Sequence, residues 1–247
     1  MSVSETHLSG CLICGSALVY ETGLSPMICV WCGTEQLSEV RCENDHFICS
    51  ACHASSGRDL ISRVCLATNE TDPLGLADRI MHAPGIHLHG PEHHFLVPAV
   101  LLTAVANQTK QPSALPRWID KANQRSMLVP GGFCGMTGTC GAAVGTGIAL
   151  SIMTDNTPLS ESTWGLCQEL TAAALSSIAS KGGPRCCKRD SFLAIQTAVR
   201  FLNDRLDYTL PESEITCSFS AKNKECLKGR CPFFPSESVS IPDPGVF

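Results

Sequence analysis

Residues 191–206, SFLAIQTAVRFLNDRL, decide the fold class of this chain. Their large apolar residues recur at spacings of three and four, which places them on one stripe of a helix. The stripe consists of Phe192, Ile195, Val199, Leu202 and Leu206. The segment therefore predicts an amphipathic helix.

Four earlier segments also lack the period-2 alternation of strands: HHFLVPAVLLTAVANQ, SALPRWIDKANQRSML, CGAAVGTGIALSIM and TWGLCQELTAAALSSIAS. We predict a mainly α protein in which residues 76–247 form a Cys-rich helical bundle. A small zinc-binding module at residues 1–56 precedes it. The polar stretch TNETDPLG, punctuated by Pro73 and Gly75, indicates a linker at residues 57–75.

The corner before the last helix, GGPRCCKRD at residues 182–190, carries adjacent cysteines among three cations. The cations are Arg185, Lys188 and Arg189. Positive charge and a helix N-terminus lower the pKa of a thiol, and the cations also suit an anionic substrate. A helix-to-helix corner needs neither thiols nor cations, so we expect Cys186, Cys187 and Arg185 to be catalytic. Adjacent side chains diverge, so we expect one cysteine to face the loop at 134–140 and the other the C-terminal cysteines.

A histidine-rich stretch, HAPGIHLHGPEHH, covers residues 82–94. Pro91 suits the first turn of a helix, which would place His93 and His94 in its opening turns. Histidine is the usual general acid or base near neutral pH and a common metal ligand. We include His93 and His94 among the candidate catalytic residues, and we interpret His82 and His87 as parts of a solvated loop.

Five further cysteines are candidate cofactor ligands. The glycine-rich loop VPGGFCGMTGTCG carries Cys134 and Cys140, and CSFSAKNKECLKGRCPFF carries Cys217, Cys226 and Cys231. The last three cannot close a tetrahedral site, so a fourth ligand must come from another loop, from substrate or from solvent. The candidates are Cys186, Cys187, Cys134, Cys140, His93 and His94. A 4Fe-4S cluster held by three cysteines would leave one iron open as a Lewis acid, as in a lyase or sulfur-transfer enzyme.

The N-terminal module contains eight metal ligands with typical zinc spacing. They are Cys11, Cys14, Cys29, Cys32, Cys42, His46, Cys49 and Cys52. We expect two structural zinc ions. Sequential pairing, in which the first four ligands bind one ion as a zinc ribbon, is favoured over a crossed pairing. The crossed pairing remains open because residues 29–52 resemble the first six ligands of a RING finger, with Cys11 and Cys14 supplying the last pair.

Composition narrows the function classes. The chain has 247 residues with 16 cysteines and a net charge of −5. Its start lacks a secretion signal, so we expect a cytoplasmic protein in which clustered cysteines bind metal. The absence of a long basic run argues against nucleic acid. Residues 126–154 carry no charged side chain, but Pro130 and many glycines favour a buried, close-packed helix over a membrane span.

Four motifs together, HHFLVPAVLL, PGGFCGMTGTCGAAVGTGI, GGPRCCKR and C…NKECL…RCPFF, resemble a family of prokaryotic Cys-rich proteins of unknown function. The resemblance covers residues 92–234 and implies no activity. Two hypotheses follow. Either the helical domain performs iron–sulfur or reactive-thiol chemistry on a small anionic or sulfur-containing substrate, or all the cysteines bind structural zinc in an adaptor that serves a partner enzyme.

Overall fold

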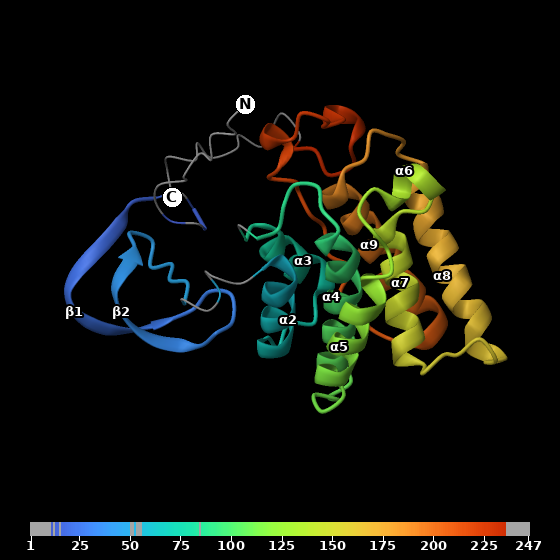
Figure 1. The fold of residues 1–247 in the computed structure, drawn as a ribbon, viewed down its shortest axis with the longest axis horizontal. Coiled ribbons are helices and arrows are strands. Elements are labelled where there is room, and N and C mark those ends of the chain that lie inside the picture. The colour runs from blue at the N-terminus through green and yellow to red at the C-terminus, as the bar shows by residue number, and fades with distance from the viewer. Residues whose placement is uncertain are drawn as a thin grey trace.

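A computed structural model describes residues 11, 13–14, 16–49, 52, 56–83 and 85–235. These residues form a β hairpin followed by eight α-helices. Figure 1 shows the hairpin on one side of the helical bundle, beside α2. The prediction of a mainly helical domain behind a small Cys-rich module is confirmed.

The elements follow one another in a simple order. The strands are β1 (Leu18–Ile28) and β2 (Glu35–Cys42). The helices are α2 (Gly57–Ala67), α3 (Pro73–Met81), α4 (Glu92–Gln108), α5 (Leu115–Ser126), α6 (Phe133–Thr137), α7 (Gly141–Met153), α8 (Ser162–Ala179) and α9 (Cys187–Leu206). Two 3-10 turns, η1 (Ser220–Lys222) and η2 (Lys228–Arg230), lie in the C-terminal loop.

The hairpin is antiparallel and irregular. Leu18 pairs with Cys42 at its open end and Ile28 with Glu35 at the turn, with a register shift between Tyr20 and Ser25. Most of its side chains are exposed. A ribbon that buries so little apolar surface has no core of its own, so other groups must stabilise this module.

Helix α4 forms the centre of the bundle. Every residue from Phe95 to Ala106 is buried, because α4 packs against α2, α3, α5, α7 and α9. Helix α7 approaches it through small residues: a Cβ built on Gly145 would lie 2.8 Å from Cδ of Pro98. Helices that are apolar on all sides belong in the interior.

The charge-free stretch at residues 126–154 does not form one long helix. It divides into α6 and α7, and Gly138 between them has a φ of 71°. In the part of the chain that the structure describes, no helix is long and apolar enough to cross a membrane.

Helix α9 carries the apolar stripe that the sequence predicts. Phe192, Ile195, Val199 and Leu202 are buried, and Leu206 packs against the core at its edge. The helix begins at Cys187, and Cys186, with no side-chain capping bond, is its N-cap residue. Asp190 reaches back, and its carboxylate accepts a hydrogen bond from the backbone N–H of Cys186 at 3.4 Å.

Residues 57–75, expected to be a linker, contain α2 and the start of α3. Leu60, Ile61 and Val64 are buried in the core. Arg58 donates to the side chain of Asn123 on α5 at 2.8 Å, so α2 is tied to the bundle by polar contacts as well. The apolar face of α2 makes this stretch part of the packed helices.

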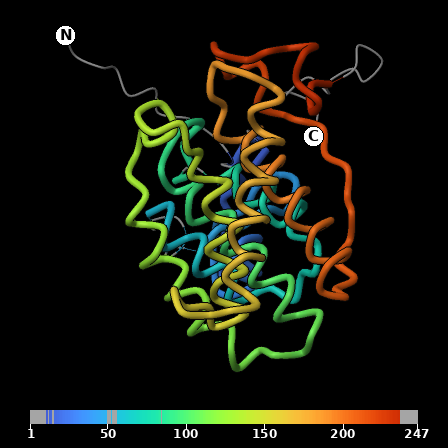
Figure 2. The backbone as a smooth tube through the Cα atoms, turned by 90° about the vertical axis from the view of Figure 1, so that its right-hand side faces the viewer, coloured from blue at the N-terminus to red at the C-terminus, as the bar shows by residue number. Residues whose placement is uncertain are grey.

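The chain after α9 returns along the bundle and covers the end where α4, α7 and α9 begin (Figure 2). Contacts link these three helix starts: a Cβ on Gly141 would touch the ring of His94, and the backbone of Gly90 hydrogen-bonds the thiol of Cys187. The loop at residues 217–235 joins them, since Asn223 donates to Sγ of Cys186 at 3.4 Å. Most of the candidate residues of the helical domain therefore lie at one end of the bundle.

Candidate metal centres and the cysteine-rich end of the bundle

The N-terminal ligands form two groups, each with its ligand atoms within 4.8 Å of one another. The first group consists of Cys11, Cys14, Cys42 and His46, and the second of Cys29, Cys32, Cys49 and Cys52. Each group could hold a metal ion. The favoured sequential pairing is wrong, and the crossed pairing is the one that the structure has.

The hairpin register explains the crossed pairing. Because Leu18 pairs with Cys42, the end of β2 lies beside the Cys11–Cys14 turn. Cys29 and Cys32 lie at the opposite end, in the turn between the strands. The returning chain reaches that turn through a hydrogen bond from Val30 N–H to the carbonyl of Phe47 at 3.0 Å, which brings Cys49 and Cys52 with it.

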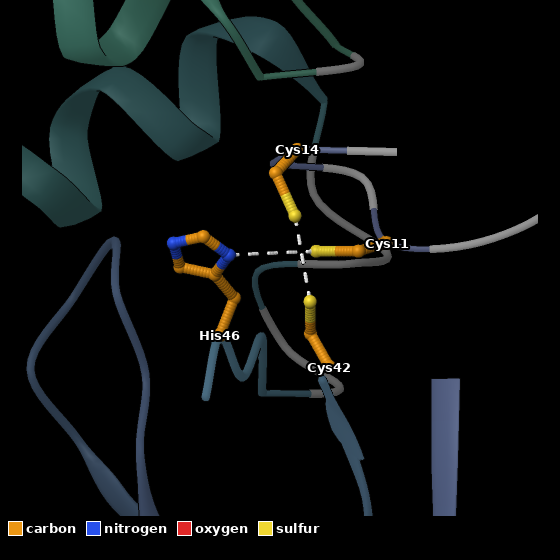
Figure 3. Close-up of side chains that lie close together, drawn as sticks. All are labelled: Cys11, Cys14, Cys42 and His46. Atoms are coloured by element: carbon orange, nitrogen blue, oxygen red, sulfur yellow. Dashed lines mark hydrogen bonds between the residues drawn. The ribbon is translucent and has the colours of Figure 1, made fainter. Parts of the chain in front are cut away.

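The distances in both groups suit a single ion. In the first group, Figure 3 shows Cys14 and Cys42 pointing toward each other with their Sγ atoms 3.4 Å apart. Cys11 Sγ lies 3.9 Å from Nδ1 of His46. In the second group the Sγ atoms of Cys32 and Cys49 are 3.7 Å apart. Tetrahedral bonds of about 2.3 Å separate two thiolates by about 3.8 Å.

Hydrogen bonds to sulfur favour the thiolate form of the cysteines in the first group. The backbone N–H groups of Ile13 and Asn44 donate to Cys11 and Cys42 at 3.4 and 3.3 Å, two residues after each cysteine. Desolvation raises the pKa of Cys14, but hydrogen bonds from Ser16 and Asn44 outweigh it and lower that pKa to about 5. A cysteine binds a metal ion as a thiolate, so stabilising the thiolate favours binding.

The two predicted histidines lie at the start of α4. His93 is 1% exposed, and its Nδ1 lies 3.1 Å from the carbonyl of Gly90. Burial lowers the pKa of His93 to about 3, so the ring is neutral, and its buried Nε2 has no hydrogen-bond partner among the described residues. Burial also lowers the pKa of His94, whose Nδ1 is 2.9 Å from the carbonyl of Val129.

Burial raises the pKa of both Cys186 and Cys187. Arg189 and Arg185 lower these pKa values as expected, but burial outweighs them, so the net shift is opposite to the one predicted from charge alone. Lys188 is 1% exposed and donates to the carbonyl of Met81 at 3.1 Å, and burial lowers its pKa to about 8. Arg189 is also buried and pairs with Asp190 at 3.0 Å.

Cys186 and Cys187 diverge as expected, but only Cys186 has the expected neighbours. It lines a narrow cavity together with Cys217, Cys226 and Cys231. Cys187 instead receives a hydrogen bond from the backbone of Gly90, in the histidine-rich loop. No sequence pattern indicated that Asn223 would be the buried donor to Cys186.

A second, larger cavity of about 360 Å³ lies on the other side of the corner. Cys134 and Cys140 line it from the α6–α7 loop, and Arg185 and Asp190 from the corner. Burial raises the pKa of Cys140 to about 11, whereas Cys134 is partly exposed. Arg189 lines both cavities.

Fold and sites together define a mainly helical, Cys-rich protein with two candidate metal centres in its N-terminal part. The profile of a family of unknown function, DUF5714, matches residues 61–234, and the chain belongs to this family. No curated protein and no solved structure matches the chain. The family match covers the helical domain and leaves both N-terminal clusters outside it.

Proposed function

We propose that this is a cytoplasmic metalloprotein with two zinc ions in its N-terminal module and iron–sulfur or thiol chemistry in its helical domain. Zinc suits the N-terminal clusters because its structural sites are closed tetrahedral shells of four cysteines, or of three cysteines and one histidine. Iron–sulfur or thiol chemistry suits the other end, where the cysteines line cavities. The substrate is a small anionic or sulfur-containing molecule.

The observation that carries this proposal is the cavity between two distant motifs. Cys134 and Cys140 line this cavity from the α6–α7 loop, and Arg185 lines it from the 182–190 corner. The cavity has a volume of about 360 Å³, which suits a small molecule. Arg185 is exposed, and among the described residues nothing forms a hydrogen bond or ion pair with it. A free guanidinium beside a partly exposed thiol is a site for an anionic group that reacts at sulfur.

Site-specific alkylation of Cys134 tests the proposal. Iodoacetate is an anion and iodoacetamide is its neutral analogue, so the ratio of their rates at Cys134, followed by mass spectrometry, measures the local attraction for anions. We expect Arg185→Gln to lower this ratio roughly three- to tenfold, and we expect Lys181→Gln, which removes an exposed cation outside the cavity lining, to leave it nearly unchanged. Equal ratios in the wild type and in Arg185→Gln would contradict an anion site.

The alternative function is that of a non-enzymatic zinc-binding adaptor for a partner enzyme. The hairpin favours it, because Tyr20, Leu24, Ile28 and Leu37 are 59–74% exposed. Large apolar side chains gathered on a small ribbon often mark a protein contact. Metal analysis separates the two: three or four zinc ions and no iron per chain would favour the adaptor.

A further inference from the structure

We propose that Cys186, Cys217, Cys226 and Cys231 form a third metal centre, which binds a 4Fe-4S cluster through four thiolates. The inference rests on the proposed function, since it assigns the cofactor and its ligands beside the cavity of Cys134. Among the fourth ligands that the sequence left open, it selects Cys186, in place of the alternative of a three-cysteine cluster.

The first support is that the four cysteines converge. Cys217 precedes η1, Cys226 and Cys231 flank η2, and Cys186 caps α9, yet all four line one cavity. Its remaining walls include Phe192, Phe219 and Phe233, and its single charged side chain is Arg189.

The second support is the hydrogen bonding of the sulfur atoms. The backbone N–H of Phe219 donates to Cys217 at 3.4 Å and that of Lys228 to Cys226 at 3.3 Å. The offset of two residues is the same as at Cys11 and Cys42 in the N-terminal cluster. Amide donors aimed at sulfur stabilise thiolates and tune iron–sulfur clusters.

The lone buried Cys65 provides the contrast. None of the described backbone amides donates to it, and burial raises its pKa to about 12. A buried cysteine with no such donor is a small apolar residue. The amide donors at Cys217 and Cys226 therefore set these two thiols apart from the buried Cys65 in the same domain.

The third support is a buried positive charge without a carboxylate partner. Lys188 is 1% exposed and donates to the carbonyl of Met81 at 3.1 Å. In the described part of the chain no carboxylate lies within 4.0 Å of its Nζ, and Glu92 and Asp78 attract it only from further away, whereas Arg189 has Asp190. A buried unpaired cation is costly unless an anion lies near it. A 4Fe-4S core with four thiolates carries a net charge of about −2, and Nζ of Lys188 lies 4.7 Å from the centre of the Phe219 ring, which lines the cavity.

The spacing of the sulfur atoms favours a cluster over zinc. Among the described residues, only the two N-terminal groups have all their ligand atoms within 4.8 Å of one another. The sulfur atoms of the four cysteines of the third centre are thus not all within 4.8 Å of one another, whereas thiolates on one zinc ion lie about 3.8 Å apart. A cluster places an iron at each of four corners, so its thiolates surround a wider volume.

Four protein ligands also decide what the cluster can do. Each iron has a cysteine, so no iron is left open to a substrate hydroxyl or thiol. The Lewis-acid lyase that a three-cysteine cluster would allow is thereby excluded. The centre is of the kind that carries an electron or holds the 217–235 loop onto α9.

The full chain, purified without oxygen and reconstituted with ferrous iron and sulfide, tests the proposal. We expect about four iron, four acid-labile sulfide and two zinc per chain, with a broad visible absorption that bleaches with dithionite. A third zinc in place of iron, or iron without sulfide, would overturn the cluster assignment.

Two neighbouring substitutions test the ligand assignment. Cys186→Ser should lower the iron content at least threefold, whereas Cys187→Ser, its matched control, should retain it. Cys231→Ser gives a second test at a position outside α9, in case Cys186→Ser unfolds the helix start. Far-UV circular dichroism and an unchanged zinc content report folding in each variant.

The same iron content from Cys186→Ser and Cys187→Ser would show that Cys186 is not a ligand. The alkylation test at Cys134 is independent of iron. A normal cluster without an anion preference at Cys134 would reject the proposed substrate site alone, and the reverse result would reject the cluster alone.

Discussion

The hairpin module and the helical bundle use cysteine in opposite ways. Between residues 11 and 49 the only described side chain other than cysteine that is buried is Trp31. The bundle, in contrast, has a large apolar core in α4, α7 and α9, and six of its cysteines surround two cavities at one end. Cysteines replace a core in the first region, whereas in the second they lie at one end of an apolar core, against which Cys140, Cys217 and Cys231 pack.

This comparison indicates which region of the molecule holds the proposed thiol or cluster chemistry. Sulfur atoms as close together as those of Cys14 and Cys42 could hold a metal ion, and such an ion would hold the chain around it. The cysteines that line the two cavities lie at the end of a core that is apolar without them, which is where the proposed chemistry belongs. We therefore expect the proposed chemistry in the bundle, and we expect the cysteines of the module to stabilise its fold.

Removal of zinc should have the largest effect, and it should unfold the hairpin module while the bundle stays folded. A strong chelator should unfold residues 11–52, because structural zinc contributes roughly 10 kcal/mol or more to such a module. The helical circular dichroism signal should remain, and hydrogen exchange followed by mass spectrometry should show the loss of protection confined to the module.

Cys49→Ser removes one ligand of the second group and should have the same effect without a chelator. Cys167→Ser is its control, because Cys167 is a buried cysteine of α8 outside both clusters. If chelation melted the helices as well, the two regions would form one cooperative unit. Trp31 offers the route for such coupling, because it belongs to the same buried cluster as the helical core.

Sequence patterns predicted the local features of both regions. The stripe from Phe192 to Leu202 and the eight N-terminal ligands depend only on spacing, and both are present. The pairing of the ligands depends on the register of the hairpin, in which Cys42 returns to Leu18. Spacing along the chain contains no such information.

The cysteine-rich end of the bundle was harder to predict for a related reason. Cys186 meets Cys217 only because the C-terminal loop packs against the start of α9. The burial of Lys188 and Arg189 is also a tertiary effect, since such side chains are almost never fully buried without a partner. Desolvation then reverses the direction of the thiol pKa shifts that charge alone would give.

Acid should weaken the bundle through His93. Its pKa is about 3 in the folded protein and 6.5 in the unfolded chain, so between these values the unfolded state binds more protons. Stability is therefore full above pH 6.5 and falls by about 1.4 kcal/mol per pH unit below it. Lys188, His94 and His89 face the ring and oppose its protonation further.

His93→Asn should remove this dependence and keep a donor for the carbonyl of Gly90. Urea unfolding at pH 7 and pH 5 should lose about 2 kcal/mol less in this variant than in the wild type. His87→Asn, whose ring is 74% exposed, should behave as the wild type does. An unchanged slope in His93→Asn would mean that another group controls acid stability.

The smallest effects on the free energy of unfolding are expected from two glycine substitutions in the bundle. In Gly145→Ala the new Cβ would lie 2.8 Å from Pro98 and 3.1 Å from Val97, so α4 and α7 must separate at a cost of about 1–3 kcal/mol. Gly165→Ala on α8 meets nothing within 4 Å and should gain about 0.5–1 kcal/mol of stability from helix propensity.

Urea unfolding, followed by the helical circular dichroism signal, should show both shifts in stability. The shifts should be equal with and without chelator, because close packing in the bundle involves no metal. A chelator-dependent difference between the two variants would instead show that the zinc module supports the contact between α4 and α7.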